Sequence, residues 1–232
     1  MKSNPTLGEF IAHHGRPSKL EAGQRVFHEG DVSTAVYACL SGRINVFITT
    51  PTGRDLILGS KSPIQGFGEL SAIDAGPRSA SAVAVEPTVV AQIPGEQFRV
   101  WLAELPQLAL TVMRELAEQV RRDNARASAW ASENITQRVG HLLVDLTAKY
   151  HRHGQPTDPT DLPITQDEVA AWVGASREST ARALAVLRRT GAIETARHKI
   201  VVIDCRALIR VLSARATTEG SAIRQATGVR AL

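Results

Sequence analysis

The sequence is poor in cysteine and in aromatic residues: its 232 residues include two Cys, and Phe, Trp and Tyr together make up 4%. Cys39 and Cys205 lie far apart, each in an apolar segment that resembles a strand. We therefore expect two reduced, buried thiols in a cytoplasmic protein rather than a disulfide. Two thiols are also too few for the iron–sulfur cluster of an oxygen sensor.

Long apolar runs are missing as well. No segment approaches the ~18 consecutive apolar residues of a membrane helix, and the N-terminus lacks the core of a signal peptide. No pairing of nucleophile and base points to a hydrolytic enzyme. His141, His151 and His153 suggest a metal, but no carboxylate or cysteine completes the set, and an exposed loop is the simpler interpretation. We expect neither an enzyme nor a metal site nor a bound cofactor.

The net charge of +4 is unevenly distributed along the chain. Residues 1–134 carry 13 Lys and Arg against 14 Asp and Glu, a net of −1, whereas residues 135–232 carry 14 against 9, a net of +5. This is the distribution expected if the second half of the chain meets a polyanion and the first half does not.

Short apolar segments, separated by glycines, fill the chain from about residue 20 to residue 90. Several of them alternate with a period of two, which is typical of an all-β roll or barrel. The expected strands are residues 26–27, 35–40, 43–48, 56–58, 79–85 and 89–93.

One glycine-rich stretch in this region has the composition of a phosphate site. Gly66 and Gly68 permit close approach of the backbone to a ligand, and the residues after them can open a helical turn whose N–H groups favour an anion. Arg78 adds a planar cation that can grip two phosphate oxygens. Glu69 would repel a phosphate, so its expected partner is a sugar hydroxyl. Together these residues favour a ribose phosphate over free phosphate.

This stretch resembles the phosphate-binding cassette of cyclic-nucleotide-binding domains, in which Gly-Glu-Leu is followed after a short spacer by Arg-Ser/Thr-Ala. The resemblance implies that the Glu binds the ribose 2′-hydroxyl and the Arg binds the cyclic phosphate. Turn glycines at residues 23, 30 and 42 extend the resemblance over the wider β-roll. The matching ligand-binding positions are Gly68, Glu69, Leu70, Arg78, Ser79 and Ala80.

A long helix is expected after the roll. Residues 97–105 form a short helix, and Pro106 suits the first turn of the next one. From about residue 109, steps of four and three residues give a heptad seam flanked by charges, which favours a parallel homodimer over burial of the stripe on the roll. The seam positions are Met113, Leu116, Val120, Asp123, Ala127 and Trp130.

The second half contains the pattern of a helix-turn-helix. A hinge at residues 132–134 precedes a fresh amphipathic helix. Further on, Thr165 and Glu168 have the spacing of a capping box, which predicts a helix start. Gly174 supplies a short turn, and Ser176 is a suitable N-cap for a second helix with a polar, basic first turn. The inward positions of that second helix are Ala183, Leu184 and Leu187.

Residues 193–195 and 200–203 can pair as a wing hairpin after this motif. The arrangement resembles the winged helix-turn-helix of the catabolite activator protein (cyclic-AMP receptor) family, whose recognition helix opens Ser-Arg-Glu-Thr and continues to an Arg. Arg177 is placed to read guanine, and Glu178 to accept from a cytosine amino group. The expected DNA-binding positions are Ser176, Arg177, Glu178, Ser179, Arg182, His198 and Lys199.

On these motifs the chain is identified as a member of the Crp/Fnr family over about residues 18–210. The resemblance implies an α+β fold and a homodimeric regulator of double-stranded DNA, with a TGTGA-like half-site and RNA polymerase as a further partner. A cyclic nucleotide, with cyclic AMP favoured, would rotate the DNA domains about residues 133–135. A relative with a vestigial cassette, answering another effector or none, remains open. The expected parts are a β-roll (1–105), a dimerisation helix and hinge (106–134), a winged helix-turn-helix (135–212) and a mobile tail (213–232).

The chain departs from this family at Asp123 and Asn124, where cyclic-AMP-responsive relatives carry Thr followed by Ser or Asn to contact adenine. In a parallel dimer the two Asp123 carboxylates would approach each other and strain the seam unless donors are supplied. A purine amino group can supply one, so both residues are expected at the ligand, and cyclic GMP is an alternative effector. In the other reading, Asp123 turns outward to Arg122 or Arg126, and Asn124 alone meets the base.

Overall fold

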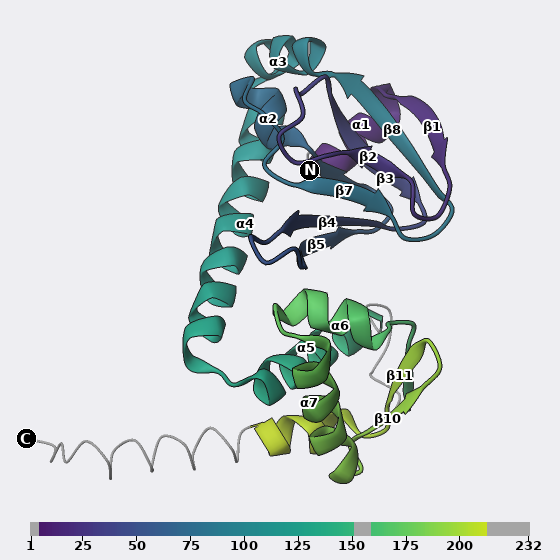
Figure 1. Cartoon of the computed structure of the whole chain (residues 1–232). Helices are drawn as coiled ribbons and strands as arrows, with labels where there is room; N and C mark the ends of the chain where they lie inside the picture. The colour runs from purple at the N-terminus through teal and green to yellow at the C-terminus, as the bar shows by residue number, and fades with distance from the viewer. Residues whose placement is uncertain (1–4, 151–158, 213–232) are drawn as a thin grey trace, which may run out of the picture. The chain divides into compact units, whose positions relative to one another are not determined.

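The computed structural model describes residues 5–150 and 159–212 (Figure 1). The chain forms two compact units that divide after Arg126. The fold is α+β, as the sequence predicted: strands dominate the first unit, and helices with a small sheet form the second. The long helix α4 (Pro106–Ser132) passes through the division and begins at the proline expected to start it.

The first unit is an antiparallel roll of two four-stranded sheets, with strand orders β1-β8-β3-β6 and β2-β7-β4-β5. Three shorter helices accompany it. Before α4, the elements in chain order are α1 (Leu7–His14), β1 (Arg16–Leu20), β2 (Arg25–Phe27), β3 (Ala35–Ser41), β4 (Ile44–Thr49), β5 (Asp55–Lys61), β6 (Gln65–Phe67), α2 (Glu69–Asp74), β7 (Ser81–Ala84), β8 (Thr88–Pro94) and α3 (Gly95–Glu104).

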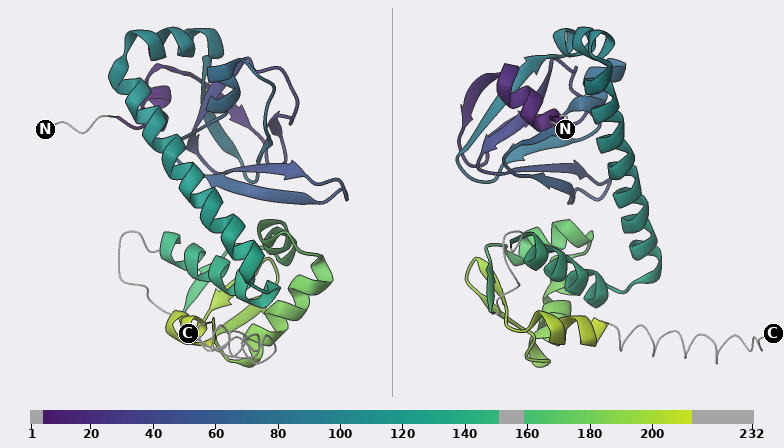
Figure 2. Two further views of the ribbon diagram at one scale, coloured as in Figure 1. Left: turned by 90° about the vertical axis from the view of Figure 1, so that its left-hand side faces the viewer. Right: turned by 180° about the vertical axis from the view of Figure 1, so that it is seen from behind.

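Strand β3 is buried on both faces, which explains its continuous apolar sequence. Tyr37 packs between the two sheets with Phe67 of β6, and their rings stack at 5.4 Å. Val36 faces the other way and packs with Phe10 of α1 and Phe98 of α3. Figure 2 shows α1 lying across the outside of the roll, where it contacts β3, β6 and β8. The roll therefore has an inner core between the sheets and an outer core beneath the helices.

The sequence reading missed several elements of the roll. Helix α1 carries a capping box of Thr6 and Glu9, a signal that was available and overlooked. Strand β1 is exposed except at Leu20 and lies at a sheet edge, so it lacks the alternation of a half-buried strand. The strand expected over residues 79–85 begins at Ser81, because the residues before it remain in the loop after α2.

The second unit packs α5, α6, α7 and a further helix over residues 205–212 against a three-stranded sheet of order β10-β11-β9. Its core is apolar and continuous, and Val139, Leu143 and Leu187 within it are fully buried. The elements are α5 (Ile135–Tyr150), β9 (Thr160–Leu162), α6 (Gln166–Val173), α7 (Arg177–Arg189), β10 (Ile193–Ala196) and β11 (Lys199–Val202).

Two expectations for the second unit were wrong. The loop was expected to extend to residue 161, but residues 160 and 161 belong to β9, because this strand pairs with β11. Cys205 is partly exposed at the start of a helix and does not lie in a buried strand, whereas Cys39 is buried in β3 as expected. Neither cysteine forms a disulfide among the residues that the structure describes. The tail expected over residues 213–232 lies outside the described residues.

Candidate functional site

The glycine-rich stretch forms the end of β6, the helix α2 and the loop that leads to β7. Gly68 is the N-cap of α2 with φ of 77°, a left-handed conformation that favours glycine. A Cβ atom at this position would lie 2.8 Å from Nη1 of Arg78, so the close approach also requires glycine. The backbone of Arg78 is fixed on both sides, because its N–H donates to the carbonyl of Asp31 and its carbonyl accepts from Gly30, each at 2.8 Å.

The side chain of Arg78 is turned into the roll and is only 3% exposed. Nη1 donates to the carbonyl of Gly68 at 2.7 Å and to the hydroxyl of Ser71 at 2.9 Å. Nη2 donates to the carbonyl of Ala35 at 2.5 Å. The guanidinium carbon lies 4.1 Å from the ring centroid of Phe27, a cation–π contact. Sequence reasoning missed Ser71, Ala35 and Phe27, which no motif marks.

Charge around Arg78 is incompletely balanced. The guanidinium forms no salt bridge with any carboxylate among the described residues, and its Nε, although buried, has no hydrogen-bond partner there. Burial lowers the pKa of Arg78, while Tyr37, Glu69 and Asp31 act in the opposite direction. A buried cation with an unused donor is costly unless a ligand supplies an acceptor. An anion is the ligand that this site can hold best.

The other expected ligand-binding residues differ in how far they are buried. Glu69 is the first residue of α2 and is buried, close enough to Arg78 to affect its pKa. Ala80 is also buried, whereas Ser79 is exposed at the surface of the cassette. Leu70 is exposed on α2 and points away from this interior. The structure thus brings Glu69, Arg78 and Ala80 into one buried region.

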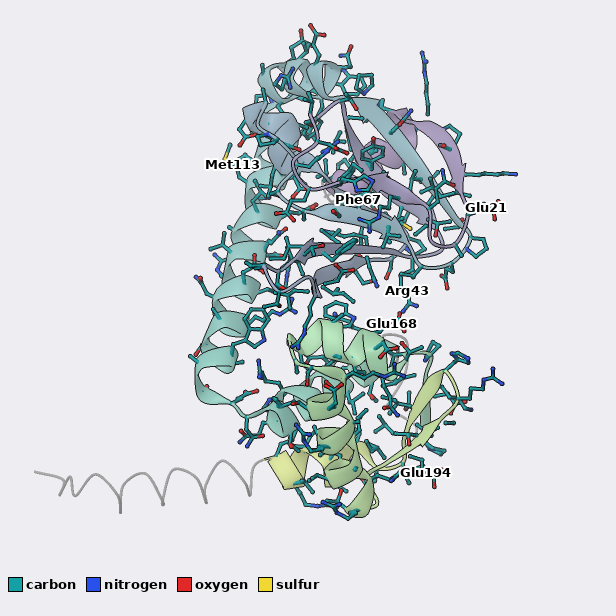
Figure 3. All side chains as sticks on the ribbon, viewed as in Figure 1. Glu21, Arg43, Phe67, Met113, Glu168 and Glu194 are labelled. Carbon is teal, nitrogen blue, oxygen red and sulfur yellow. The ribbon has the colours of Figure 1, made fainter. Side chains whose placement is uncertain are left out.

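The expected seam on α4 is largely exposed within the first unit. Met113 and Val120 are 59% and 57% exposed, and Figure 3 shows Met113 projecting from the side of α4 away from the roll. The roll is instead covered by Leu108 and Val112. Leu116 differs from the expectation, because it packs partly against the outer core of the roll. An exposed apolar stripe flanked by charge is the surface that a partner helix covers in a coiled coil.

Asp123 and Asn124 are both exposed on α4. Asp123 lies close enough to Arg126 to raise the pKa of that guanidinium, while burial lowers it more strongly. Arg126 in turn donates to the carbonyls of Ile57 and Leu58 on β5. The sequence left two readings open, and the electrostatic influence of Asp123 on Arg126 agrees with the one in which Asp123 turns toward an arginine. Sequence reasoning missed the contact with β5, because nothing local to residue 126 indicates it.

The helix-turn-helix has the local signals that the sequence predicted. The hydroxyl of Thr165 accepts from Glu168 N–H at 3.2 Å, and the Glu168 carboxylate accepts from Thr165 N–H at 2.9 Å, so the capping box of α6 is confirmed. Gly174 ends α6 with φ of 64°. Ser176 caps α7 by accepting from Ser179 N–H at 3.2 Å. The residues of α7 expected to face the core are buried: Ala183, Leu184 and Leu187. Thr180 is buried with them.

The first turns of α7 present polar and charged side chains to solvent. Arg177, Glu178 and Arg182 are exposed, and Arg182 donates to the Ser179 hydroxyl at 2.9 Å. Arg177 forms a salt bridge with Asp167 of α6, 3.1 Å from Nε to Oδ1, which the sequence did not suggest. The surface has the chemistry for contacts with base edges and phosphates.

The wing is the tight hairpin of β10 and β11. His198 lies in its turn with φ of 62° and is exposed. Lys199 forms a salt bridge, because its Nζ lies 2.6 Å from the carboxylate of Asp161 on β9. His198 and Lys199 therefore lie at a hairpin tip and beside it, while the recognition residues lie on α7.

Two negative findings apply to the described ranges. No group of three or more His, Cys, Asp and Glu side chains in residues 5–150 and 159–212 is arranged to hold a metal ion. His141 instead lies 3.0 Å from the Glu133 carboxylate, and His151 and His153 fall outside those ranges. Among the described helices, none is both long enough and apolar enough to cross a membrane.

Comparison with known families matches both units. Residues 17–104 match the model of the cyclic nucleotide-binding domain. Residues 137–211 match the model of the Crp-like helix-turn-helix domain. The two matches contain the cassette and the α6–α7 motif, respectively.

Similar proteins align with both units of the chain. A cyclic AMP receptor protein of Thermus thermophilus is 32% identical over 74% of this chain and 76% of its own length. A CRP-like cAMP-activated global transcriptional regulator of Mycobacterium tuberculosis is 29% identical over 84% of this chain and 87% of its own. Among solved structures, a c-di-GMP-responsive global regulator of Xanthomonas campestris superposes with a TM-score of 0.74 at 23% identity, covering 83% of this chain and 95% of that one. A CRP/FNR-family transcriptional regulator of Thermus thermophilus gives 0.67 at 24% identity, covering 85% and 98%.

Proposed function

The chain belongs to the Crp/Fnr family of transcription regulators, and on this basis we propose that it is a homodimer whose sequence-specific DNA binding is controlled by cyclic AMP. Its relatives are transcription regulators and not enzymes, in agreement with the sequence-based expectation. The nucleotide would bind at the cassette of the first unit, and α7 of the second unit would enter the major groove. We place the protein in the cytoplasm, with RNA polymerase as a further partner.

The observation that carries the proposal is the buried, incompletely paired Arg78. Its Nε has no partner among the described residues, and no carboxylate forms a salt bridge with it. A cyclic phosphate supplies both an acceptor and a negative charge. The buried carboxylate of Glu69 can accept from the ribose 2′-hydroxyl. The same geometry argues against a vestigial cassette, because a site without a ligand has no use for an unsatisfied buried cation.

Asp123 supports cyclic GMP as the second candidate effector. It lies exposed on α4 where the family pattern has a Thr, and it offers only acceptors. Guanine presents N1–H and an amino group side by side, whereas adenine presents a single amino group. The attraction between Asp123 and Arg126 favours cyclic AMP, because a carboxylate drawn toward a neighbouring cation leaves Asn124 to meet the base.

The DNA half of the proposal is tested by selection from random duplexes with the full-length protein, with and without cyclic AMP. We expect a two-fold palindrome with TGTGA-like half-sites whose centres lie about 10–10.5 base pairs apart. Arg177→Ala is expected to cost about 1–3 kcal/mol of binding and to relax the preference at one G·C pair. Recovery of the same sequence preference by the variant and the wild type would remove Arg177 as a base reader.

A further inference from the structure

We propose that Asp167 is a positioning residue that sets DNA specificity by orienting Arg177, an inference that rests on the proposed DNA-binding function. The carboxylate Oδ1 of Asp167 lies 3.1 Å from Nε of Arg177, and the two form a salt bridge. The residues are ten positions apart in the sequence and come from different helices, α6 and α7. The contact therefore belongs to the folded motif and not to either helix alone.

The backbone beneath this pair is held firmly at both helix starts. Asp167 is the second residue of α6, directly inside the capping box of Thr165 and Glu168. Arg177 is the first residue of α7 and follows its N-cap, Ser176. Helices α6 and α7 also pack directly on each other. The mobile part of the arrangement is the Arg177 side chain, which has several rotatable bonds and gains a fixed direction from the contact with Asp167.

The guanidinium nitrogen that pairs with Asp167 determines which nitrogens of Arg177 remain available for DNA. The ion pair joins Oδ1 of Asp167 to the Nε side of the guanidinium. The two Nη groups form the outer edge of the guanidinium, and this edge can meet O6 and N7 of a guanine. When Asp167 holds the Nε side of the Arg177 guanidinium, the two Nη groups are left as a fork for one base.

The pair is exposed, at 73% for Arg177 and 64% for Asp167, so it contributes little to folding stability. Its exposure places a carboxylate beside the surface expected to meet DNA. A negative charge there opposes every phosphate contact, whatever the base sequence. The gain from Arg177 with guanine offsets that repulsion only at the correct site. Asp167 therefore weakens non-specific binding more than specific binding.

Stabilisation of α6 is the competing explanation for Asp167, because acidic residues in a first turn interact favourably with a helix dipole. That role predicts an effect on unfolding and no effect on base preference. The wing supplies a matched control: Asp161 is 61% exposed and its carboxylate lies 2.6 Å from Nζ of Lys199. Asp161→Asn makes the same change in charge, in the same unit, beside another proposed DNA contact.

The experiment measures the affinity of the full-length wild type, Asp167→Asn and Asp161→Asn for a selected palindrome, for the palindrome with its guanine replaced, and for a scrambled duplex. We expect Asp167→Asn to bind the scrambled duplex more tightly than the wild type does. The ratio of its affinity for the palindrome to its affinity for the scrambled duplex should fall about two- to fivefold. Asp161→Asn is expected to strengthen binding to all three duplexes by the same factor. In an Arg177→Ala background, Asp167→Asn should no longer change the base preference.

Each outcome decides the proposal. An unchanged specificity ratio in Asp167→Asn, with the wild type still selecting its site, overturns the role of Asp167 and leaves the proposed function intact. An equal loss of specificity in Asp161→Asn also overturns it, because charge alone would then be sufficient. A wild type that shows no sequence preference under any nucleotide condition overturns the proposed function and this inference together.

Discussion

Nη2 of Arg126 lies 2.6 Å from the carbonyl oxygen of Ile57, although the two residues are 69 positions apart. Nη1 of the same guanidinium lies 3.1 Å from the carbonyl oxygen of Leu58. Strand β5 is at the edge of its sheet, and its register with β4 shifts at this point, which is the mark of a β-bulge. Arg126 therefore satisfies backbone acceptors on an irregular edge strand and joins α4 to the β4–β5 hairpin.

We predict that Arg126→Ala destabilises the protein by about 1–3 kcal/mol, because it removes two charge-assisted hydrogen bonds to backbone carbonyls. Urea unfolding followed by circular dichroism measures the change. Arg122→Ala is the matched control: its side chain is exposed and forms an ion pair with Glu118 at 3.8 Å. The control should change stability by less than about 0.5 kcal/mol. Equal effects of the two substitutions would show that the contact with β5 has no energetic role.

Cys39 gives a prediction about pH. Burial raises the pKa of its thiol from 9.0 to about 11, and repulsion from Glu86 acts in the same direction. Between these values the folded protein keeps the proton that the unfolded chain releases, so the free energy of unfolding falls as pH rises. The contribution is fully present below pH 9 and is lost as the pH approaches 11, a loss of about 2–3 kcal/mol.

Comparison with Cys39→Ala isolates this effect from other groups that titrate at high pH. The small cavity in the variant lowers stability by an amount that does not depend on pH, so the gap between wild type and variant should narrow above pH 9. Stability curves that stay parallel to pH 11 would contradict the assignment. In the native state a thiol reagent should modify Cys205 well before Cys39.

The proposed homodimer is tested on the exposed stripe of α4. Val120→Asp places a charge in the seam and should shift the protein to monomer in sedimentation equilibrium. Ala125→Asp is the matched control, because residue 125 is also exposed and lies about 140° around the helix from residue 120. A dimer that survives Val120→Asp as well as Ala125→Asp would place the interface elsewhere.

Asp123→Thr tests the choice of purine. If Asp123 contacts the base, the substitution should change the ratio of affinities for cyclic AMP and cyclic GMP and should alter DNA binding without nucleotide, since it removes a charge from the seam. Calorimetry with each nucleotide measures the ratio, and fluorescence anisotropy measures DNA binding. If neither the affinity ratio nor DNA binding changes, Asp123 interacts with Arg126 and not with the base, and Asn124 is the base contact.

The sequence predicted best what is encoded locally. The capping box of Thr165 and Glu168, the turn at Gly174 and the N-cap at Ser176 each depend on residues within a few positions, and the structure confirms all three. The proline start of α4 is of the same kind. Residue types and a family resemblance also located the stretch that holds Arg78 and Glu69, and within it Gly68 adopts a left-handed conformation that favours glycine.

Contacts that depend on tertiary packing were not predictable. The carbonyl of Ala35, which accepts from Arg78, comes from a strand 43 positions away, and backbone groups carry no sequence signal. The pairing of Arg177 with Asp167 requires the angle between two helices, which the motif does not specify. Leu116 fitted the heptad pattern but packs partly on the roll, because a helix beside a domain divides its apolar residues between two faces.

The central claim is that a cyclic nucleotide held by Arg78 controls DNA binding. The most direct measurement is the anisotropy of a labelled palindromic duplex titrated with the full-length protein, with and without saturating cyclic AMP or cyclic GMP. We predict that one nucleotide strengthens DNA binding by roughly 5- to 150-fold. In Arg78→Leu, shown to be folded by circular dichroism, nucleotide binding should weaken by about 2–4 kcal/mol and the enhancement should disappear at the same nucleotide concentration. A wild type whose DNA affinity is the same with and without either nucleotide would contradict the account.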